Sequence, residues 1–395
     1  MKKILAILVC ALLVSVVAAP DSYAAPKTIT VNVVLKQEAT PAIQKQLASL
    51  GRISKKIDAI NALSMTLKAD KLDDLLALDF VEAANEDALR NTGPVDKSLA
   101  TQITENGLST WNLDAINVTD FGKGRTVEQT GEGVYVAVLD TGLIKQWREF
   151  FPVDQILTQY AKSFGGGGSA NATISEQPNV WEQDVNSHGT HVTSTILGYR
   201  LNASLINGVA PEVKIIPVKV LNQNGSGSSF VISQGITYIA DLAKELEMPI
   251  VINMSLGGPQ LDAVEKAAID YAIASGVIIV ASAGNAGDKG MSYPAAYEPV
   301  ISVAASGWTG EWIANGWWKG NVADPTVAEN FYITDFSSRD QVVEHDLDVA
   351  APGSLIVGPY AVDQGKYGYY YLGGTSMASP HVAGAVALML EKDSS

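Results

Sequence analysis

The sequence contains little cysteine, little histidine and little positive charge. Its single cysteine, Cys10, cannot form an intrachain disulfide, which excludes a disulfide-stapled fold and a metal centre built from several cysteines. Lysine and arginine number 27 against 42 acidic residues, and the formal net charge is −15. This balance excludes attraction to nucleic acid or to anionic lipid through bulk charge. Only four histidines occur, so each is a separate candidate for function.

Long apolar runs are also scarce. The longest, Ile4–Ala19, follows Lys2 and Lys3 and precedes Ser22-Tyr-Ala24, which has small residues where a signal peptidase cuts. It is shorter than the roughly 20 apolar residues of a membrane-spanning helix. We therefore predict a signal peptide over residues 1–24. The mature protein is expected to be secreted, extracellular or in the cell envelope, with no membrane attachment after cleavage.

The remaining composition is typical of a folded protein. Apolar residues make up 47% of the 395 residues and charged residues 17%, which permits a sizeable core and excludes disorder as the main description. The length allows two or three domains, or one large domain with a small one.

Residues 25–91 form the first candidate domain, a small α+β unit. Strands are predicted at 29–35, 63–67 and 81–85, and helices at 41–50, where Thr40 is placed to cap, and at 69–78. The polar, aperiodic stretch that follows contains Gly93-Pro94 and is predicted to be an exposed linker over residues 92–108.

The rest of the chain, 109–395, alternates apolar strands with helices. Strands are predicted at 134–139, 213–220, 249–253, 276–281 and 300–304, and helices at 188–197, 228–246, 261–274 and 375–390. Continuous apolar strands separated by helices indicate an α/β fold, with a mostly parallel sheet and helices on both faces. Functional sites of such sheets form at the carboxyl ends of the strands.

Four polar residues stand where strands end or helices begin: Asp140, His188, Asn285 and Ser376. Each has an ordinary structural explanation, as a turn-capping aspartate, a capping or core histidine, a turn asparagine and an N-cap serine. His188 and His191 are also spaced to share a metal ion, but no acidic residue with metalloprotease spacing accompanies them.

Taken together, these residues indicate a nucleophilic site. A serine hydroxyl is a weak nucleophile near neutral pH and needs a base, and histidine has the side-chain pKa closest to that pH. A buried carboxylate can fix the imidazole tautomer and stabilise the imidazolium. The chain order Asp, His, Ser is one of the known solutions for this triad.

Three motifs resemble the signatures of subtilisin-like serine proteases (subtilases): Asp140-Thr-Gly, His188-Gly-Thr-His-Val and Gly374-Thr-Ser-Met-Ala-Ser-Pro-His-Val-Ala-Gly384. The resemblance implies a subtilisin-like fold in which Asp140 orients His188, the general base, and Ser376 is the nucleophile. It assigns the oxyanion hole to Asn285 and the Ser376 backbone N–H, and structural roles to His191 and His381. It implies that the substrate cleft is lined by Ser255, Leu256, Gly257, Gly258, Ala283 and Gly284.

The same resemblance implies how the protein works. It predicts a secreted serine endopeptidase that acts on proteins or peptides through an acyl-enzyme and is made as a self-processing zymogen. Residues 25–91 resemble the family's propeptide, an intramolecular inhibitor and folding aid, and the maturation bond is expected within 92–108. A monomer without a catalytic cofactor is expected. The resemblance allows a structural calcium ion between Glu149 and the loop 200–207, although that loop lacks carboxylates.

Some features depart from the family pattern. Fewer residues follow Ser376 than is usual, which makes the catalytic domain short at its C-terminus and favours the alternative of an inactive binding or inhibitory relic. The stretch 307–330 resembles an insertion and holds four of the seven tryptophans, and 165–168 is a run of glycines. A lipase or esterase is disfavoured, because Gly-x-Ser-x-Gly is absent around Ser376.

Overall fold

The structure is a computed structural model. It describes residues 27–93, 96–99, 111–120, 124–164, 180–201, 204–311, 327–339, 347–362 and 366–393. The predicted signal peptide, the glycine run, His345 and most of the tryptophan-rich stretch lie outside these residues.

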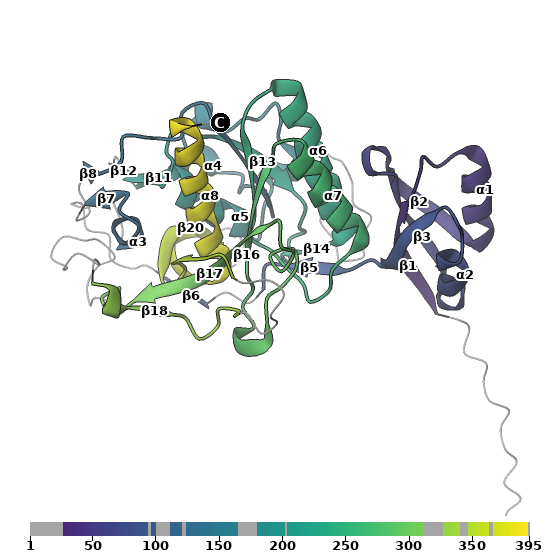
Figure 1. The fold of residues 1–395 in the computed structure, drawn as a ribbon. Coiled ribbons are helices and arrows are strands. Elements are labelled where there is room, and N and C mark those ends of the chain that lie inside the picture. The colour runs from purple at the N-terminus through teal and green to yellow at the C-terminus, as the bar shows by residue number, and fades with distance from the viewer. Residues whose placement is uncertain are drawn as a thin grey trace, which may run out of the picture.

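The small unit, residues 27–86, is a four-stranded antiparallel sheet with helices (Figure 1). Its strand order is β2-β3-β1-β4. The elements are β1 (Thr28–Leu35), α1 (Pro41–Leu50), β2 (Gly51–Ile57), η1 (Asp58–Ile60), β3 (Ala62–Lys68), η2 (Ala69–Lys71), α2 (Leu72–Leu76) and β4 (Val81–Glu86). The Thr40 side chain caps α1 by accepting a hydrogen bond from the Ile43 N–H, as predicted.

The sequence prediction missed β2 and overextended the second helix. β2 is an edge strand, and it carries Arg52, Lys55 and Lys56 on a largely exposed surface. Charged residues are common on edge strands because they discourage pairing with other chains, so this strand lacks a strong apolar signal. The predicted helix 69–78 is instead a 3₁₀ turn, η2, followed by the short α2.

The large unit, residues 111–393, is built on an eight-stranded sheet. The strand order in this sheet is β10-β13-β9-β15-β16-β17-β18, and β19 also pairs with β17. All pairings are parallel except that of β18. The strands are β9 (Tyr135–Asp140), β10 (Lys162–Ser163), β13 (Lys214–Lys219), β15 (Ile250–Met254), β16 (Ile278–Ser282), β17 (Ile301–Trp308), β18 (Phe331–Ile333) and β19 (Val349–Pro352).

The helices and peripheral strands cover this sheet, and the predicted helices and long strands are confirmed with small shifts at their ends. The helices are α3 (Trp111–Ala115), α4 (Trp147–Phe150), α5 (His188–Leu197), α6 (Ser229–Leu246), α7 (Ala263–Ala274) and α8 (Thr375–Lys392). Short 3₁₀ helices are η3 (Val153–Gln155), η4 (Val180–Glu182), η5 (Gly287–Lys289) and η6 (Ala328–Asn330). Peripheral strands are β7 (Thr119–Asp120), β8 (Gly124–Arg125), β11 (Gly198–Leu201), β12 (Ser204–Asn207), β20 (Ile356–Val362) and β21 (Lys366–Gly373).

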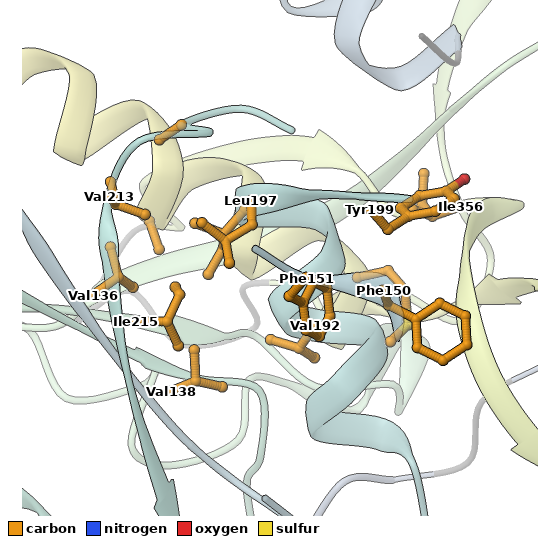
Figure 2. Packing of buried hydrophobic residues seen from close by; sticks show 14 of the residues in the cluster. Val136, Val138, Phe150, Phe151, Val192, Leu197, Tyr199, Val213, Ile215 and Ile356 are labelled. Carbon is orange, nitrogen blue, oxygen red and sulfur yellow. The ribbon is translucent and has the colours of Figure 1, made fainter. Parts of the chain in front are cut away.

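Both faces of the sheet are buried. On β9, Val136 and Val138 belong to a core shared with α5 and α8, and Ala137 and Leu139 belong to a core shared with α6 and α7. Figure 2 shows the first core, where these valines lie among side chains of neighbouring elements. Successive strand residues point to opposite faces, so a strand covered on both sides must be apolar throughout.

β9 lies where the strand order reverses. The chain passes from β9 to β13 on one side and later to β15 on the other. In parallel sheets, the crevice at the carboxyl ends of the strands beside such a point is the usual ligand site. Asp140 is the last residue of β9.

Of the predicted linker 92–108, the described residues 96–99 form a strand, and the end of the predicted first domain also pairs with the large unit. The short strand β5 (Leu89–Asn91) pairs with β14 (Ser226–Ser228) of the large unit, and β6 (Asp96–Leu99) pairs with β21. We call residues 89–93 the cleft segment.

In the described part of the chain, no helix has both the length and the apolar content needed to cross a membrane.

The small unit should depend on its own core. Leu63 of β3 is fully buried there, whereas Leu76 at the end of α2 is exposed. We expect Leu63→Ala to lower the opening free energy of the β1 and β3 amides by about 2–5 kcal/mol, because it removes buried methyl groups and leaves a cavity. Hydrogen-exchange mass spectrometry measures this, with Leu76→Ala as the control, expected to shift by less than about 0.5 kcal/mol. Equal effects would contradict this core assignment.

Candidate active site

Asp140 and His188 meet at the carboxyl end of β9. His188 is the first residue of α5, and its Nδ1 lies 2.8 Å from Asp140 Oδ1 and 2.9 Å from Oδ2. Both side chains are buried. When Nδ1 carries a proton and donates it to the carboxylate, Nε2 of the neutral ring is left as the basic nitrogen.

The helix approaches the strand closely because Gly189 has no side chain. A Cβ at Gly189 would lie 2.4 Å from the Gly142 carbonyl oxygen and 3.2 Å from Asp140 Cβ. A larger residue would push α5 away from β9 and separate the Asp140–His188 pair.

A second layer of polar groups surrounds Asp140. The Thr141 hydroxyl donates to Asp184 Oδ2 at 2.8 Å and accepts from the Gly189 N–H at 2.9 Å. The Lys219 ammonium donates to the Thr141 carbonyl at 2.6 Å. Burial raises the pKa of Asp184 to about 6, although Lys219 opposes this shift, and burial lowers the pKa of Lys219. Sequence reasoning assigned no role to Asp184 or Lys219, because they come from separate segments.

Ser376 is the second residue of α8. Its hydroxyl lies 3.3 Å from the Ser255 carbonyl oxygen and 3.4 Å from that of Thr92, both long for a hydrogen bond of this kind. Among the described residues, His188 Nε2 has no hydrogen-bond partner, so it is not bonded to Ser376 in this arrangement. The Ser255 hydroxyl donates to the Ser376 carbonyl at 2.9 Å and ties the end of β15 to α8.

Asn285 is held beside the N-terminus of α8. Its Oδ1 accepts from the Thr375 N–H at 2.9 Å and from the Thr375 hydroxyl at 2.8 Å. These two bonds identify the other amide atom as the nitrogen, and a Cβ built on Gly93 would lie 3.2 Å from it. The Asn285 donor therefore faces the chain at Gly93, beside the helix terminus that carries Ser376. Helix N-termini favour negative charge.

The cleft segment lies between two walls of the large unit. Asn91 and Gly257 exchange two backbone hydrogen bonds. The Asn91 N–H donates to the Gly257 carbonyl at 3.0 Å, and the Gly257 N–H donates to the Asn91 carbonyl at 2.9 Å. On the other side, the Thr92 N–H donates to the Gly225 carbonyl at 3.0 Å. The wall at Gly257 belongs to the predicted cleft residues 255–258. The wall formed by Gly225 and β14 was not predicted, because a glycine- and serine-rich stretch carries no strand signal.

A cavity of about 250 Å³ adjoins the cleft segment. It is lined by Asn91, Thr92, Gly93, Leu256, Gly257, Gly258, Pro259, Ser282, Gly284, Asn285, Ala286, Ser292 and Thr375. Two predicted cleft residues are placed differently. Ala283 is buried and its carbonyl accepts from the Ser292 N–H, and Ser255 presents its carbonyl to Ser376.

The other described histidines are buried in the fold. His191 Nε2 lies 3.1 Å from the Ile356 carbonyl, and burial lowers the pKa of His191 to about 3. His381 bonds to the Met377 carbonyl and to Asn112, and burial lowers its pKa to about 4. Both rings are neutral at ordinary pH, and their contacts fit the structural roles predicted for them.

No cluster of three or more histidine, cysteine or acidic residues suited to a metal occurs in the described part of the chain. At the predicted calcium position, the Arg200 carbonyl already accepts from the Tyr369 hydroxyl at 2.9 Å. Residues 202–203 of that loop are outside the described residues, and the calcium ion stays a prediction.

Comparisons with known proteins agree with this architecture. Residues 131–395 match the model of the subtilase family. Subtilisin DY of Bacillus licheniformis is 36% identical over 266 residues, which cover 66% of this chain and 78% of the relative. Subtilisin E of Bacillus subtilis (strain 168) is 32% identical over 347 residues, 87% of this chain and 74% of the relative.

Two solved structures are also similar. Sphericase has 30% identity and a TM-score of 0.56, covering 74% of this chain and 87% of its own. Fervidolysin from Fervidobacterium pennivorans is described as a keratinolytic enzyme related to subtilisin. It has 25% identity and a TM-score of 0.64, and the match covers 93% of this chain and 55% of the fervidolysin chain. The family match and these relatives place the chain: it belongs to the subtilase family of subtilisin-like serine proteases.

Proposed function

We propose that this protein is a secreted serine endopeptidase made as a zymogen, with Asp140, His188 and Ser376 as its triad. The observation that carries the proposal is the cleft segment itself. A peptide strand lies backbone to backbone against Gly257 and Gly225, and the Ser376 hydroxyl lies against a peptide carbonyl of that strand. Hydrolysis of a peptide bond requires a peptide strand that is held in this way beside a nucleophile.

In the first half of the proposed reaction, His188 Nε2 takes the proton of the Ser376 hydroxyl while Oγ bonds to the substrate carbonyl carbon. The resulting oxyanion accepts hydrogen bonds from the Asn285 amide and the Ser376 N–H. His188 then gives its proton to the amine as the C–N bond breaks, leaving an acyl-enzyme. Nε2 has no partner in this arrangement, and such bonds often shorten only when a substrate is bound productively.

In the second half, water attacks the acyl-enzyme and His188 again accepts a proton, which it returns to Ser376 as the acid product leaves. Asp140 keeps its carboxylate against Nδ1 throughout and stabilises the imidazolium. This mechanism assigns no step to a cofactor or metal ion.

The proposed inhibition follows from the same contacts. The cleft segment occupies the position that a substrate strand would take, so a separate substrate cannot enter while it stays bound. Because the small unit is tethered to the large unit, the segment's effective concentration is high. We therefore assign residues 25–91 as an intramolecular inhibitor, with maturation by self-cleavage in 92–108 after export directed by residues 1–24.

A second candidate is an inactive subtilase-like module that binds or inhibits without catalysis. The occupied cleft favours it, because a permanently bound segment would leave Ser376 unreachable. A fluorophosphonate probe separates the two functions, since it labels an activated serine and leaves an inert one unmodified. Labelling of Ser376 supports the endopeptidase, and absence of labelling after removal of the small unit supports the inactive module.

We expect Ser376→Ala to abolish proteolysis and leave the precursor uncut. Loss of the nucleophile should lower kcat by about 10⁴–10⁶. Purified precursor is followed by gel electrophoresis and mass spectrometry, with Ser275→Ala at the end of α7 as the matched control. Release of a mature form by the purified Ser376→Ala protein would contradict self-processing.

We expect Asn285→Leu to lower kcat by about 10²–10³ with little change in KM, because its donor acts mainly on the oxyanion of the transition state. Leucine also removes the acceptor of the Thr375 N–H. Asn285→Asp keeps that acceptor and should lose a similar or larger part of kcat. A large rise in KM with kcat unchanged would instead make Asn285 a ground-state binding or turn residue.

A further inference from the structure

Arg90 of the cleft segment is completely buried in the large unit. Its Nε lies 3.1 Å and 3.2 Å from the two carboxylate oxygens of Glu265, and its Nη2 lies 2.5 Å from Oε2. The same Nη2 donates to the Gln260 carbonyl at 2.8 Å. Both side chains of the pair are fully inaccessible to solvent. The guanidinium is therefore bound in a forked arrangement and is not a surface charge.

The large unit is shaped to admit this side chain. A Cβ at Gly258 would lie 2.8 Å from Arg90 Nη1 and 2.3 Å from the Leu89 carbonyl oxygen. Only a residue without a side chain at position 258 leaves room for both the backbone of the cleft segment and the guanidinium. We call Gly258, Gln260 and Glu265 the arginine pocket.

The pocket is electrostatically incomplete without a cation. Among the described residues, Arg90 supplies the hydrogen bonds to the Glu265 carboxylate and is the positive group that acts on it. Asp262 and Asp87 lie close enough to act on the pair and add negative charge. If the cleft segment leaves, Glu265 and Asp262 remain as neighbouring carboxylates, and Glu265 has lost the cation that pairs with it.

The pocket is also at a fixed distance from the reacting serine. Arg90 is followed by Asn91, which pairs with Gly257. The next residue is Thr92, whose carbonyl faces Ser376. A substrate strand that forms the same backbone bonds would place one residue at the position of Arg90. The side chain of that residue, three or four residues before the bond that is cut, would enter the arginine pocket.

We propose that the arginine pocket is a specificity site that selects substrates with arginine at this one upstream position. The proposal rests on the endopeptidase function above and adds a substrate class to it. Arginine fits better than lysine, because the contacts use Nε and Nη2 in a fork, whereas lysine presents a single ammonium group.

The test uses peptides with the sequence of residues 85–93 followed by Ala-Ser-Ser, in which the residue matching Arg90 is Arg, Lys or Gln. The wild-type protein is matured first, and mass spectrometry locates the cut bond. We expect kcat/KM to fall by about 30-fold or more from Arg to Gln, as expected for loss of a buried charge pair, and by less for Lys. Moving arginine by one position should remove its advantage.

Glu265→Gln tests the protein side. The precursor also carries Arg90→Gln, so that neither change leaves a buried charge unpaired during folding. We expect the preference for Arg over Gln to fall to within about threefold, with the Gln peptide still cleaved. Asp270→Asn, which changes an exposed acid on the same helix, should keep the wild-type preference.

The outcomes are distinguishable. If the wild type cuts the Arg and Gln peptides within twofold of each other, Arg90–Glu265 serves only to hold the small unit, and the specificity proposal is wrong. A preference that survives Glu265→Gln would also overturn it. If no peptide and no denatured protein is cut, the endopeptidase function itself fails, and the pocket loses its role with it.

Discussion

The close approach of α5 to the carboxyl end of β9 is the constraint on which the site depends. It brings two groups that bind water strongly, a carboxylate and an imidazole, into a dry contact of 2.8 Å. A buried carboxylate needs hydrogen-bond donors: the Thr141 N–H donates to Asp140 Oδ1 at 2.7 Å, and Asp184 and Lys219 bind Thr141 in turn. The close approach also requires that residue 189 has no side chain. The apolar strands and two cores hold these elements at the required distance.

The cleft combines two kinds of recognition. Backbone pairing with Gly257 and Gly225 accepts any extended chain, because it uses groups that every residue except proline carries. The contact of Arg90 with Glu265 depends on one side chain. A cleft with both features can process many proteins and still favour particular bonds. The same two features explain how residues 89–93 bind firmly enough to occupy it.

Much of this arrangement could be predicted from the sequence. Strands covered on both faces are apolar throughout, so runs such as 134–139 were recognisable, and the residues that follow them, Asp140 and Asn285, were natural candidates. The edge strand β2 was missed because its exposed surface is charged. The pairing of residues 89–93 with the large unit was not predicted, because it uses mainly backbone groups, which leave no pattern in the sequence. Arg90 and Glu265 are separated by 175 residues, and only the fold brings them together.

Whether the cleft segment acts as substrate or inhibitor depends on its last described residues. The Gly93 N–H turns back to Asn91 Oδ1 at 2.8 Å, and Gly93 has a φ of +69°, in the left-handed region that favours glycine. The strand therefore stops being extended next to Ser376. An extended strand would instead present its next peptide group to the serine and to the Asn285 amide. In this arrangement the Ser376 hydroxyl lies 3.4 Å from the Thr92 carbonyl oxygen, and His188 Nε2 has no partner among the described residues. The backbone pairing at Asn91 and the turn at Gly93 are therefore separate features of the segment: the first holds it in the cleft, and the second ends its extended stretch beside Ser376.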